Sequence, residues 1–280
     1  MLHAAVQPTH ALVPLVGLVV FLLVTMLSFG VRCLSIGMPR TVYIQKRNAP
    51  AFWKWCMEWW VWLWGPVERL CTRLRIRPSS ITVASTAATA VAAVLLGVGH
   101  LSTGGWVYLF AASLDLVDGR VARAQGTSSS AGAFLDSTLD RVAELLVFGG
   151  LAVHFRSTAV LYFVLWAAGS SVVVSYARAR GESLGARSEA QAGGMQRAER
   201  VVLTGVPLAF APLLGVALGL GGGDRVVGGA LALLAFLTTL TALRRTISIW
   251  RALRASTVQQ GSLANVRWLD AARRREKLGR

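Results

Sequence analysis

Four aspartates fall within a window of 26 residues near the middle of this 280-residue chain. Asp115 and Asp118 are spaced i, i+3, and Asp136 and Asp140 are spaced i, i+4, so each pair shares one face of a helix. Four carboxylates brought together cannot all be ionised without a counter-charge. A divalent cation would supply one, and oxygen ligands without nearby His or Cys favour Mg²⁺ or Mn²⁺ over zinc.

A structural alternative is an ion-pair cluster in which neighbouring arginines neutralise the carboxylates. Those arginines would be Arg120, Arg123 and Arg141. Other features favour a ligand site: Gly119 and Ala122 leave room beside the helix, and Arg123 is placed to hold a phosphate. Residues 127–130 (TSSS) add a hydroxyl-rich loop. Together these features suggest a diphosphate-bearing substrate, with one carboxylate taking a proton from an attacking hydroxyl.

The composition indicates that the helices carrying these residues lie in a membrane. Apolar residues make up 54% of the chain and charged residues 15%, and the mean hydropathy is +0.55. This apolar content excludes a disordered chain, and three cysteines exclude a disulfide framework. The net charge is nevertheless +16, from 29 Lys and Arg against 13 Asp and Glu. So many cations in an apolar chain must lie in the loops between the apolar segments.

Seven segments are long and apolar enough to predict membrane-spanning helices. They are residues 11–31, 81–98, 105–123, 133–153, 158–177, 201–220 and 226–243. One set of loops holds nine cations in residues 32–80, three in 120–141, five in 178–200 and ten from residue 244 on. The opposite loops hold only Arg156 and Arg225. This asymmetry predicts an N-terminus outside, with the C-terminus and the aspartates on the cytoplasmic side.

Two stretches are not predicted to span the membrane. Residues 52–64 contain six of the ten tryptophans, and indole prefers the headgroup level, so we expect residues 50–75 to form a helix on the cytoplasmic surface. A short re-entrant or buried helix is the alternative. The tail after Arg245 is amphipathic and ends in a basic run, for which anionic lipid heads are favoured over nucleic acid. The run comprises Arg273, Arg274, Arg275 and Lys277.

The aspartate spacing resembles the signature of the CDP-alcohol phosphatidyltransferase (phosphotransferase) family, D-x2-D-G-x2-A-R-x8-G-x3-D-x3-D. All eight fixed positions from Asp115 to Asp140 agree. The resemblance covers about residues 65–245. It implies an all-α polytopic membrane helix bundle, with a cytoplasmic surface helix, a six-helix core and one extra N-terminal transmembrane helix. The expected domains are an N-terminal transmembrane helix with a basic cytoplasmic linker (1–49), an amphipathic juxtamembrane helix (50–80), the membrane domain (81–245) and a basic amphipathic cytoplasmic tail (246–280).

The resemblance implies a metal-dependent enzyme of phospholipid biosynthesis. Family members transfer a phosphatidyl-type group from a CDP-linked lipid, such as CDP-diacylglycerol, to an alcohol and release CMP, with two divalent ions. By position, the metal ligands would be Asp115, Asp118, Asp136 and Asp140, of which Asp140 would also be the general base. The CDP-lipid site would comprise Gly119, Ala122, Arg123, Gly132, Ser129, Ser79 and Thr82. The last two lie in Pro78-Ser79-Ser80-Ile81-Thr82, where Ser79 replaces the Asn of the family's Pro-Asn-x-x-Thr.

Arginines at two further helix ends favour an anionic acceptor. Ser175, Arg178 and Arg180 end one span, and Arg197 and Arg200 begin the next. Several guanidiniums around one pocket would suit bidentate phosphate binding, although positive-inside flanking alone would also place cations there. These segments resemble the Ser-Tyr-x-Lys-Ala-Arg and Arg-x-x-Arg patterns of phosphatidylinositol-phosphate synthases, with Arg178 in place of Lys. The expected acceptor is inositol phosphate, and glycerol 3-phosphate, as in phosphatidylglycerophosphate synthases, is the second choice.

Two functions of other classes remain open. A transporter or channel with a carboxylate-lined cation path would place ionisable groups near mid-membrane in repeated halves. A non-catalytic lipid-binding protein would not need the complete aspartate quartet. The expected partners are a CDP-diacylglycerol-type lipid, a small alcohol acceptor and membrane lipids, with a homodimer implied by the resemblance and no nucleic acid. The expected location is the bacterial inner (cytoplasmic) membrane.

Overall fold

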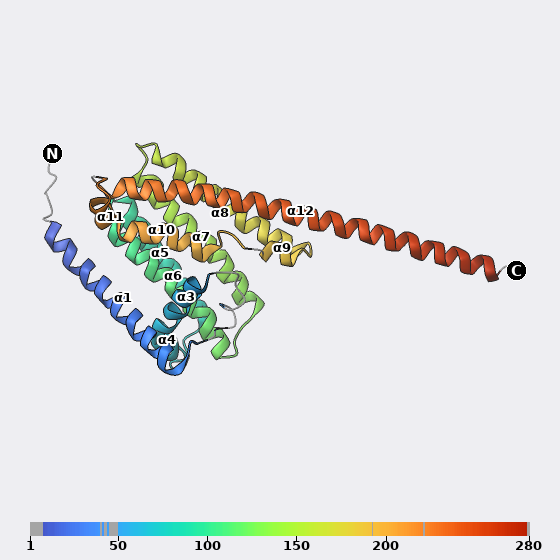
Figure 1. The fold of residues 1–280 in the computed structure, drawn as a ribbon, viewed down its shortest axis with the longest axis horizontal. Coiled ribbons are helices and arrows are strands. Elements are labelled where there is room, and N and C mark those ends of the chain that lie inside the picture. Colours follow the sequence, from blue (N-terminus) through green and yellow to red (C-terminus); the bar gives the residue numbers. More distant parts are fainter. Residues whose placement is uncertain are drawn as a thin grey trace. The chain divides into compact units, whose positions relative to one another are not determined.

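The computed structural model describes residues 8–39, 41, 44, 50–191, 193–220 and 222–278, and the environments of side chains from residue 17 to residue 256 except residue 18 and those gaps. Every regular element in this part of the chain is a helix (Figure 1), which confirms the expected all-α fold. Most of residues 40–49, which belong to the predicted N-terminal domain 1–49, and the side chains of the basic run at 273–277 lie outside the described residues.

The chain forms two compact units. One contains the described residues up to Ile76 together with Gly119–Thr127. The other contains Arg77–Asp118 and the described residues from Ser128 onward. The boundary crosses one continuous helix, α6 (Leu101–Ala124), between Asp118 and Gly119. The aspartates of the motif therefore belong to the second unit, whereas Gly119, Ala122 and Arg123 belong to the first.

The first unit is built around α1 (Pro8–Ile36), α3 (Ala51–Leu63) and α4 (Gly65–Arg73). Phe29 of α1 is fully buried between two indoles of the tryptophan-rich helix, with ring-centroid distances of 5.6 Å to both Trp55 and Trp62. Two of the tryptophans of α3 thus pack on α1. The helix expected over residues 50–75 is broken at Trp64, because Pro66 in the first turn of α4 cannot donate a backbone hydrogen bond to α3.

The second unit contains the remaining helices. They are α5 (Pro78–Gly97), the first part of α6, α7 (Ser130–His154), α8 (Val160–Ser183), α9 (Arg187–Gln191), α10 (Arg197–Ala209), α11 (Ala211–Ala217) and α12 (Gly223–Leu278). Helix α5 packs against α7, and α8 runs beside α12 (Figure 1). The α5–α7 contact is close enough that a Cβ on Gly150 would lie 2.2 Å from the Ala93 carbonyl oxygen. Small residues at a helix contact permit such close packing.

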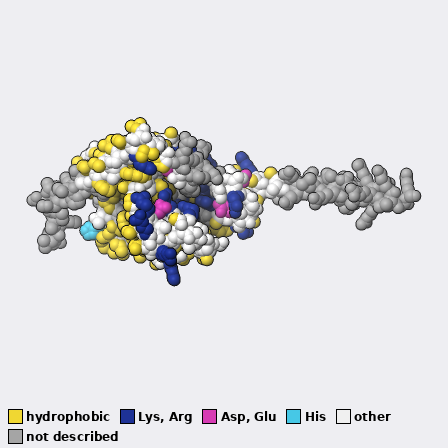
Figure 2. Space-filling model, turned by 90° about the horizontal axis from the view of Figure 1, so that it is seen from below, with side chains coloured by type: hydrophobic (Ala, Val, Ile, Leu, Met, Phe, Trp, Pro, Cys, Tyr) yellow, Lys and Arg dark blue, Asp and Glu magenta, His cyan; other side chains and the backbone are white. Residues whose placement is uncertain are grey.

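All seven predicted spans coincide with helices. Four helices among the described residues are long and apolar enough to cross a membrane, or five if α10 and α11, which meet at an angle of 70°, form one broken span. Helices α6 and α7 are 24 and 25 residues long and carry the aspartates, which lower their hydropathy. Hydrophobic side chains cover much of the surface in Figure 2. The chain is therefore a polytopic α-helical membrane protein, and the number of seven spans stays a prediction.

Helix α12 differs from the expected division at residue 245. It is a single helix of 56 residues that continues from the last apolar segment through the tail without a break. Because no Gly or Pro interrupts residues 240–256, nothing in that stretch ends the helix. The domain boundary at 245/246, like the other predicted boundaries, stays a prediction.

Candidate metal and phosphate site

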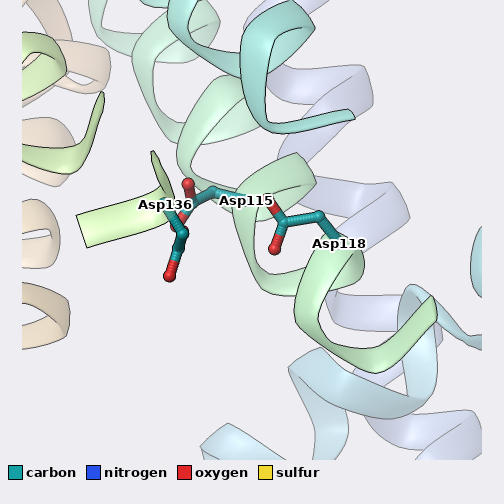
Figure 3. A group of neighbouring side chains, drawn as sticks. All are labelled: Asp115, Asp118 and Asp136. Carbon is teal, nitrogen blue, oxygen red and sulfur yellow. The ribbon is translucent and has the colours of Figure 1, made fainter. Parts of the chain in front are cut away.

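Three of the four motif aspartates converge at one point in the second unit. Asp115 and Asp118 lie one turn apart on α6, and Asp136 approaches from α7 (Figure 3). Carboxylate oxygens of the three residues all lie within 4.8 Å of one another. The side chain of Asp118 is buried, and the other two are partly buried. The i, i+3 spacing therefore places two carboxylates on one face of α6, and α7 adds the third.

The start of α7 is fixed by a capping side chain. Ser129 is the N-cap residue, and its Oγ accepts a hydrogen bond from the Gly132 backbone N–H at 3.1 Å. A Cβ on Gly132 would lie 3.2 Å from that Oγ, so a larger residue would crowd the cap. Ser129 and Gly132, expected in the nucleotide pocket, thus have a local role in setting where α7 begins. Their contact with a nucleotide stays a prediction.

Asp118 has a partner that the sequence analysis did not assign to it. Thr82, buried near the start of α5, donates from Oγ1 to Asp118 Oδ2 at 2.5 Å. Thr82 was expected in the CDP-lipid site; its hydroxyl donates to an aspartate in the structure, and its contact with the CDP-lipid stays a prediction. A hydrogen-bonded carboxylate has a fixed orientation, which matters for any cation that it binds. Ser79, by contrast, is exposed in the first turn of α5.

Arg197, at the start of α10, lies between two of the aspartates. Its Nη1 atom lies 2.5 Å from Asp140 Oδ1 and also donates to Asp115 Oδ2. Arg141 Nη1 lies 3.5 Å from the other Asp140 oxygen. The fourth aspartate is thus held by two arginines, while its three companions form the closer oxygen cluster. Arg197 was expected at the acceptor, and here it is a counter-charge of the aspartates.

The donor set of the cluster fits a divalent metal. Asp115, Asp118 and Asp136 offer only carboxylate oxygens, the ligand type that Mg²⁺ and Mn²⁺ prefer. Three carboxylates this close, one of them buried, carry more negative charge than Arg197 neutralises. Of the arginines considered as alternative counter-charges, Arg120 pairs with Glu68 inside the first unit. The residues therefore suit a divalent cation better than a closed ion-pair cluster.

The expected acceptor arginines differ in their surroundings. Arg200 is 3% exposed and is engaged on all three nitrogens. Its Nε donates to Glu144 Oε1 at 2.6 Å and its Nη2 to Glu144 Oε2 at 3.0 Å. Its Nη1 donates to the Met195 carbonyl at 3.0 Å, and Ser175 Oγ lies 3.4 Å from Nη2. This buried bidentate pair gives Arg200 a structural partner that the sequence analysis did not find.

Arg178 and Arg180 lie near the end of α8 and are exposed. Arg178 Nε donates to Glu182 Oε1 at 3.1 Å, an i, i+4 pair, and Gln191 of α9 donates to the same oxygen. Arg245 of α12 is buried and donates from Nη1 to the Val174 carbonyl of α8 at 3.1 Å. The acceptor roles of Ser175 and of the four arginines stay predictions.

The nucleotide half of the motif lies in the first unit. Arg123 is exposed on the last turn of α6, and its Nη1 lies 3.5 Å from where a Cβ on Gly119 would stand. Helix α6 ends at Ala124, and the turn that follows it passes through Gly126, whose φ of +67° favours glycine. Thr127 N–H donates to the Ala122 carbonyl at 2.9 Å. Gly119, Ala122 and Arg123 thus share one short, closed helix end, and their contact with the CDP-lipid stays a prediction.

Two signals could have identified the missed residues. Glu144 follows Asp140 by four positions and so continues the face that carries Asp136 and Asp140. Acidic residues on this face favour ion pairs with basic residues of a neighbouring helix, and α10 begins with two arginines spaced i, i+3. The pairing of Arg197 with the aspartates and of Arg200 with Glu144 depends on the tertiary placement of α10, which one sequence does not give.

Comparisons with known proteins identify the family. The sequence model of the CDP-alcohol phosphatidyltransferase family matches residues 75–241. The phosphatidylinositol phosphate synthase of Mycobacteroides abscessus is 38% identical over 144 residues, which is 50% of this chain and 64% of that protein. That of Streptomyces avermitilis is 40% identical over 156 residues, 53% of this chain and 62% of that protein. The chain thus spans less than two thirds of the length of these two relatives.

Solved structures resemble the fold as well. The crystal structure of Mycobacterium tuberculosis phosphatidylinositol phosphate synthase with CDP-DAG bound has a TM-score of 0.57 and 29% identity, and the match covers 66% of this chain and 92% of that one. The structure of the same protein with manganese and citrate has a TM-score of 0.57 and 28% identity, covering 66% and 88%. The matched range 75–241 contains every motif aspartate and more than half of the chain. The chain therefore belongs to the CDP-alcohol phosphatidyltransferase family.

Proposed function

We propose that the protein transfers a phosphatidyl group from CDP-diacylglycerol to the hydroxyl of a phosphorylated alcohol, with inositol phosphate as the acceptor, and releases CMP. The observation that carries the proposal is the oxygen cluster of Asp115, Asp118 and Asp136 within 4.8 Å, inside a motif that agrees with the family at every fixed position. The relatives named phosphatidylinositol phosphate synthase support the choice of acceptor.

The reaction is a displacement at phosphorus. The acceptor oxygen attacks the phosphorus that carries the diacylglycerol, the bond from that phosphorus to the bridging oxygen breaks, and CMP leaves with that oxygen. Asp140 accepts the proton of the acceptor hydroxyl, and Arg197 and Arg141 hold its carboxylate in place. Thr82 orients Asp118. Arg123, Gly119 and Ala122 contact the CDP part, and their small side chains and one guanidinium suit a diphosphate.

The motif aspartates would hold the divalent cation, Mg²⁺ or Mn²⁺. We assign Asp115, Asp118, Asp136 and Asp140 as ligands of two ions, as the family resemblance implies. When bound, such ions neutralise the diphosphate and the charge that develops on the leaving group. The manganese in a related structure supports a metal of this class.

The acceptor is placed beside Asp140 by the cations of α8 and α10. Arg178, Arg180, Arg197 and Arg200 give this end of the second unit a positive excess that suits a phosphorylated alcohol, and Ser175 lies among them. Glycerol 3-phosphate is the second candidate, because it presents the same phosphate charge. The site faces the cytoplasm of a bacterial inner membrane, with the N-terminus outside, and the protein acts as a homodimer surrounded by membrane lipids. The asymmetric distribution of the 29 cations supports this orientation.

One assay tests the proposal. Purified protein is mixed with CDP-diacylglycerol, Mg²⁺ and a panel of alcohols comprising inositol phosphate, glycerol 3-phosphate, inositol, serine and choline, and CMP release is measured. We expect CMP release with inositol phosphate to exceed that with glycerol 3-phosphate, and no release without a divalent cation. Preferential release with an uncharged or cationic alcohol would contradict the acceptor, and no release with any alcohol would contradict the activity.

A further inference from the structure

An ion pair inside the first unit joins α4 to the end of α6. Arg120 Nε donates to Glu68 Oε2 at 2.6 Å, and Arg120 Nη2 lies 2.5 Å from the same oxygen. The Arg120 and Glu68 side chains are only 24% and 20% exposed. A two-nitrogen contact of a guanidinium with a carboxylate is geometrically demanding, so it fixes Arg120 more firmly than a single surface contact would.

A second contact holds the same end of α6. Gln125, just after the helix, donates from Nε2 to the Ile76 carbonyl at 3.2 Å. The residues from Arg120 to Gln125 are thus attached at both ends to the segment 68–76. The closed turn at Gly126 prevents the helix from extending further.

Two of the residues that we assign to the CDP-lipid lie in the attached segment, and a third adjoins it. Gly119 directly precedes Arg120, and Ala122 and Arg123 lie between Arg120 and Gln125. Arg123 is exposed, so its backbone position decides where its guanidinium can reach. Glu68, in contrast, lies before residue 75, where the match to the family begins, and so belongs to no part of the shared motif.

We propose that Glu68 is a positioning residue for the CDP-lipid site. Acting through Arg120, it holds the last turn of α6 so that Gly119, Ala122 and Arg123 face the diphosphate in one fixed arrangement. The role of α4 is then to set the affinity for the lipid donor. This inference rests on the proposed function, since it assumes that the turn binds a CDP-lipid.

The test is a double-mutant cycle with a charge exchange. The variants E68Q, R120Q, E68Q/R120Q and E68R/R120E are purified in detergent, and the Kd for CDP-diacylglycerol, the KM for each substrate and kcat are measured. Each single substitution should raise the Kd about three- to fivefold, as expected for a partly exposed ion pair. The double substitution should raise it no further, and the exchanged pair should return it to within about twofold of the unaltered protein.

Two readouts separate positioning from general stability. The KM for the acceptor should change less than the Kd for the lipid, because the acceptor site lies in the other unit. The control R69Q removes the exposed neighbouring charge of α4 and should leave both constants unchanged. Additive effects of E68Q and R120Q, or equal increases in both substrates' KM values, would overturn the positioning role.

The outcomes also separate this inference from the proposed function. Full CMP release with an unchanged lipid Kd in E68Q would overturn the inference alone. Lipid binding that depends on Glu68 without any CMP release would overturn the proposed activity and support the inference. Failure of the unaltered protein to bind CDP-diacylglycerol would overturn both.

Discussion

The second unit contains two clusters of charged residues that differ in how their charges are paired. The aspartate cluster of Asp115, Asp118 and Asp136 gathers like charges within 4.8 Å. Two arginines at the ends of α8 and α10 instead have carboxylate partners outside the cluster, Arg178 with Glu182 and Arg200 with Glu144, whereas Arg197 pairs with Asp115 of the cluster. Like charges held together raise the energy of the fold unless a cation joins them, whereas paired charges support it. The difference indicates that the aspartates are arranged for a ligand and that the arginines also serve the fold.

The largest loss of activity is expected when an aspartate of the motif is replaced. Asp118→Asn takes one charged oxygen from the cluster, and we expect CMP release to fall on the order of 10³-fold, since loss of electrostatic stabilisation dominates such rates. Mg²⁺ affinity should fall with it. Asp140→Asn should also abolish turnover but leave metal and CDP-lipid binding partly intact, because Asp140 lies outside the three-carboxylate cluster.

The matched control is Asp224→Asn. Asp224 lies at the start of α12, is 66% exposed and pairs with His154. Its substitution removes the same charge from the chain and should leave CMP release unchanged. Near-normal turnover in Asp140→Asn would contradict its assignment as the general base.

The buried pair gives the next largest effect, on stability rather than on chemistry. Glu144→Gln leaves the Arg200 guanidinium 3% exposed and without its carboxylate. Removing one partner of a buried ion pair costs about 3 kcal/mol in the free energy of unfolding. Equilibrium unfolding in mixed detergent micelles measures this loss. A stability change below that of the partly exposed control Glu182→Gln would show that Arg200 does not depend on Glu144.

The sequence predicts the contacts between residues that are close along the chain better than those between distant ones. The aspartate cluster follows from i, i+3 and i, i+4 spacing on two helices joined by a short loop, so its residues could be chosen without a structure. The match to the family model confirms the family that the motif indicated. The partners of Arg197 and Arg200 lie 56–82 residues away along the chain, and their pairing requires the position of α10. The break of the surface helix at Trp64 was readable from Gly65-Pro66, whereas the burial of Phe29 by α3 was not.

A smaller effect, on the Mg²⁺ requirement alone, is expected from substitution of Thr82. Thr82→Val keeps the shape of the side chain and removes the hydroxyl that donates to Asp118. Groups that orient a metal-binding carboxylate typically contribute about tenfold to metal affinity, so the Mg²⁺ concentration needed for half-maximal CMP release should rise about tenfold. Thr82→Ser retains the hydroxyl and should restore the affinity. An equal loss in both variants would mean that the methyl group, and not the hydrogen bond, is what α5 contributes.

The smallest expected effect tests whether an arginine of the second group serves the acceptor as well as the fold. Arg178 is 46% exposed, and an i, i+4 surface pair such as Arg178–Glu182 stabilises a helix by only about 0.3–0.5 kcal/mol. Arg178→Gln should therefore leave unfolding nearly unchanged, while the KM for inositol phosphate rises about fivefold if one charged hydrogen bond to phosphate is lost. The KM for CDP-diacylglycerol serves as the internal reference, and Glu182→Gln, which releases Arg178 from its partner, should not raise the acceptor KM. Equal changes in both KM values would assign Arg178 to the positive flank of the membrane helix. Arg178 would then serve the fold alone, and only the aspartates would bind a ligand.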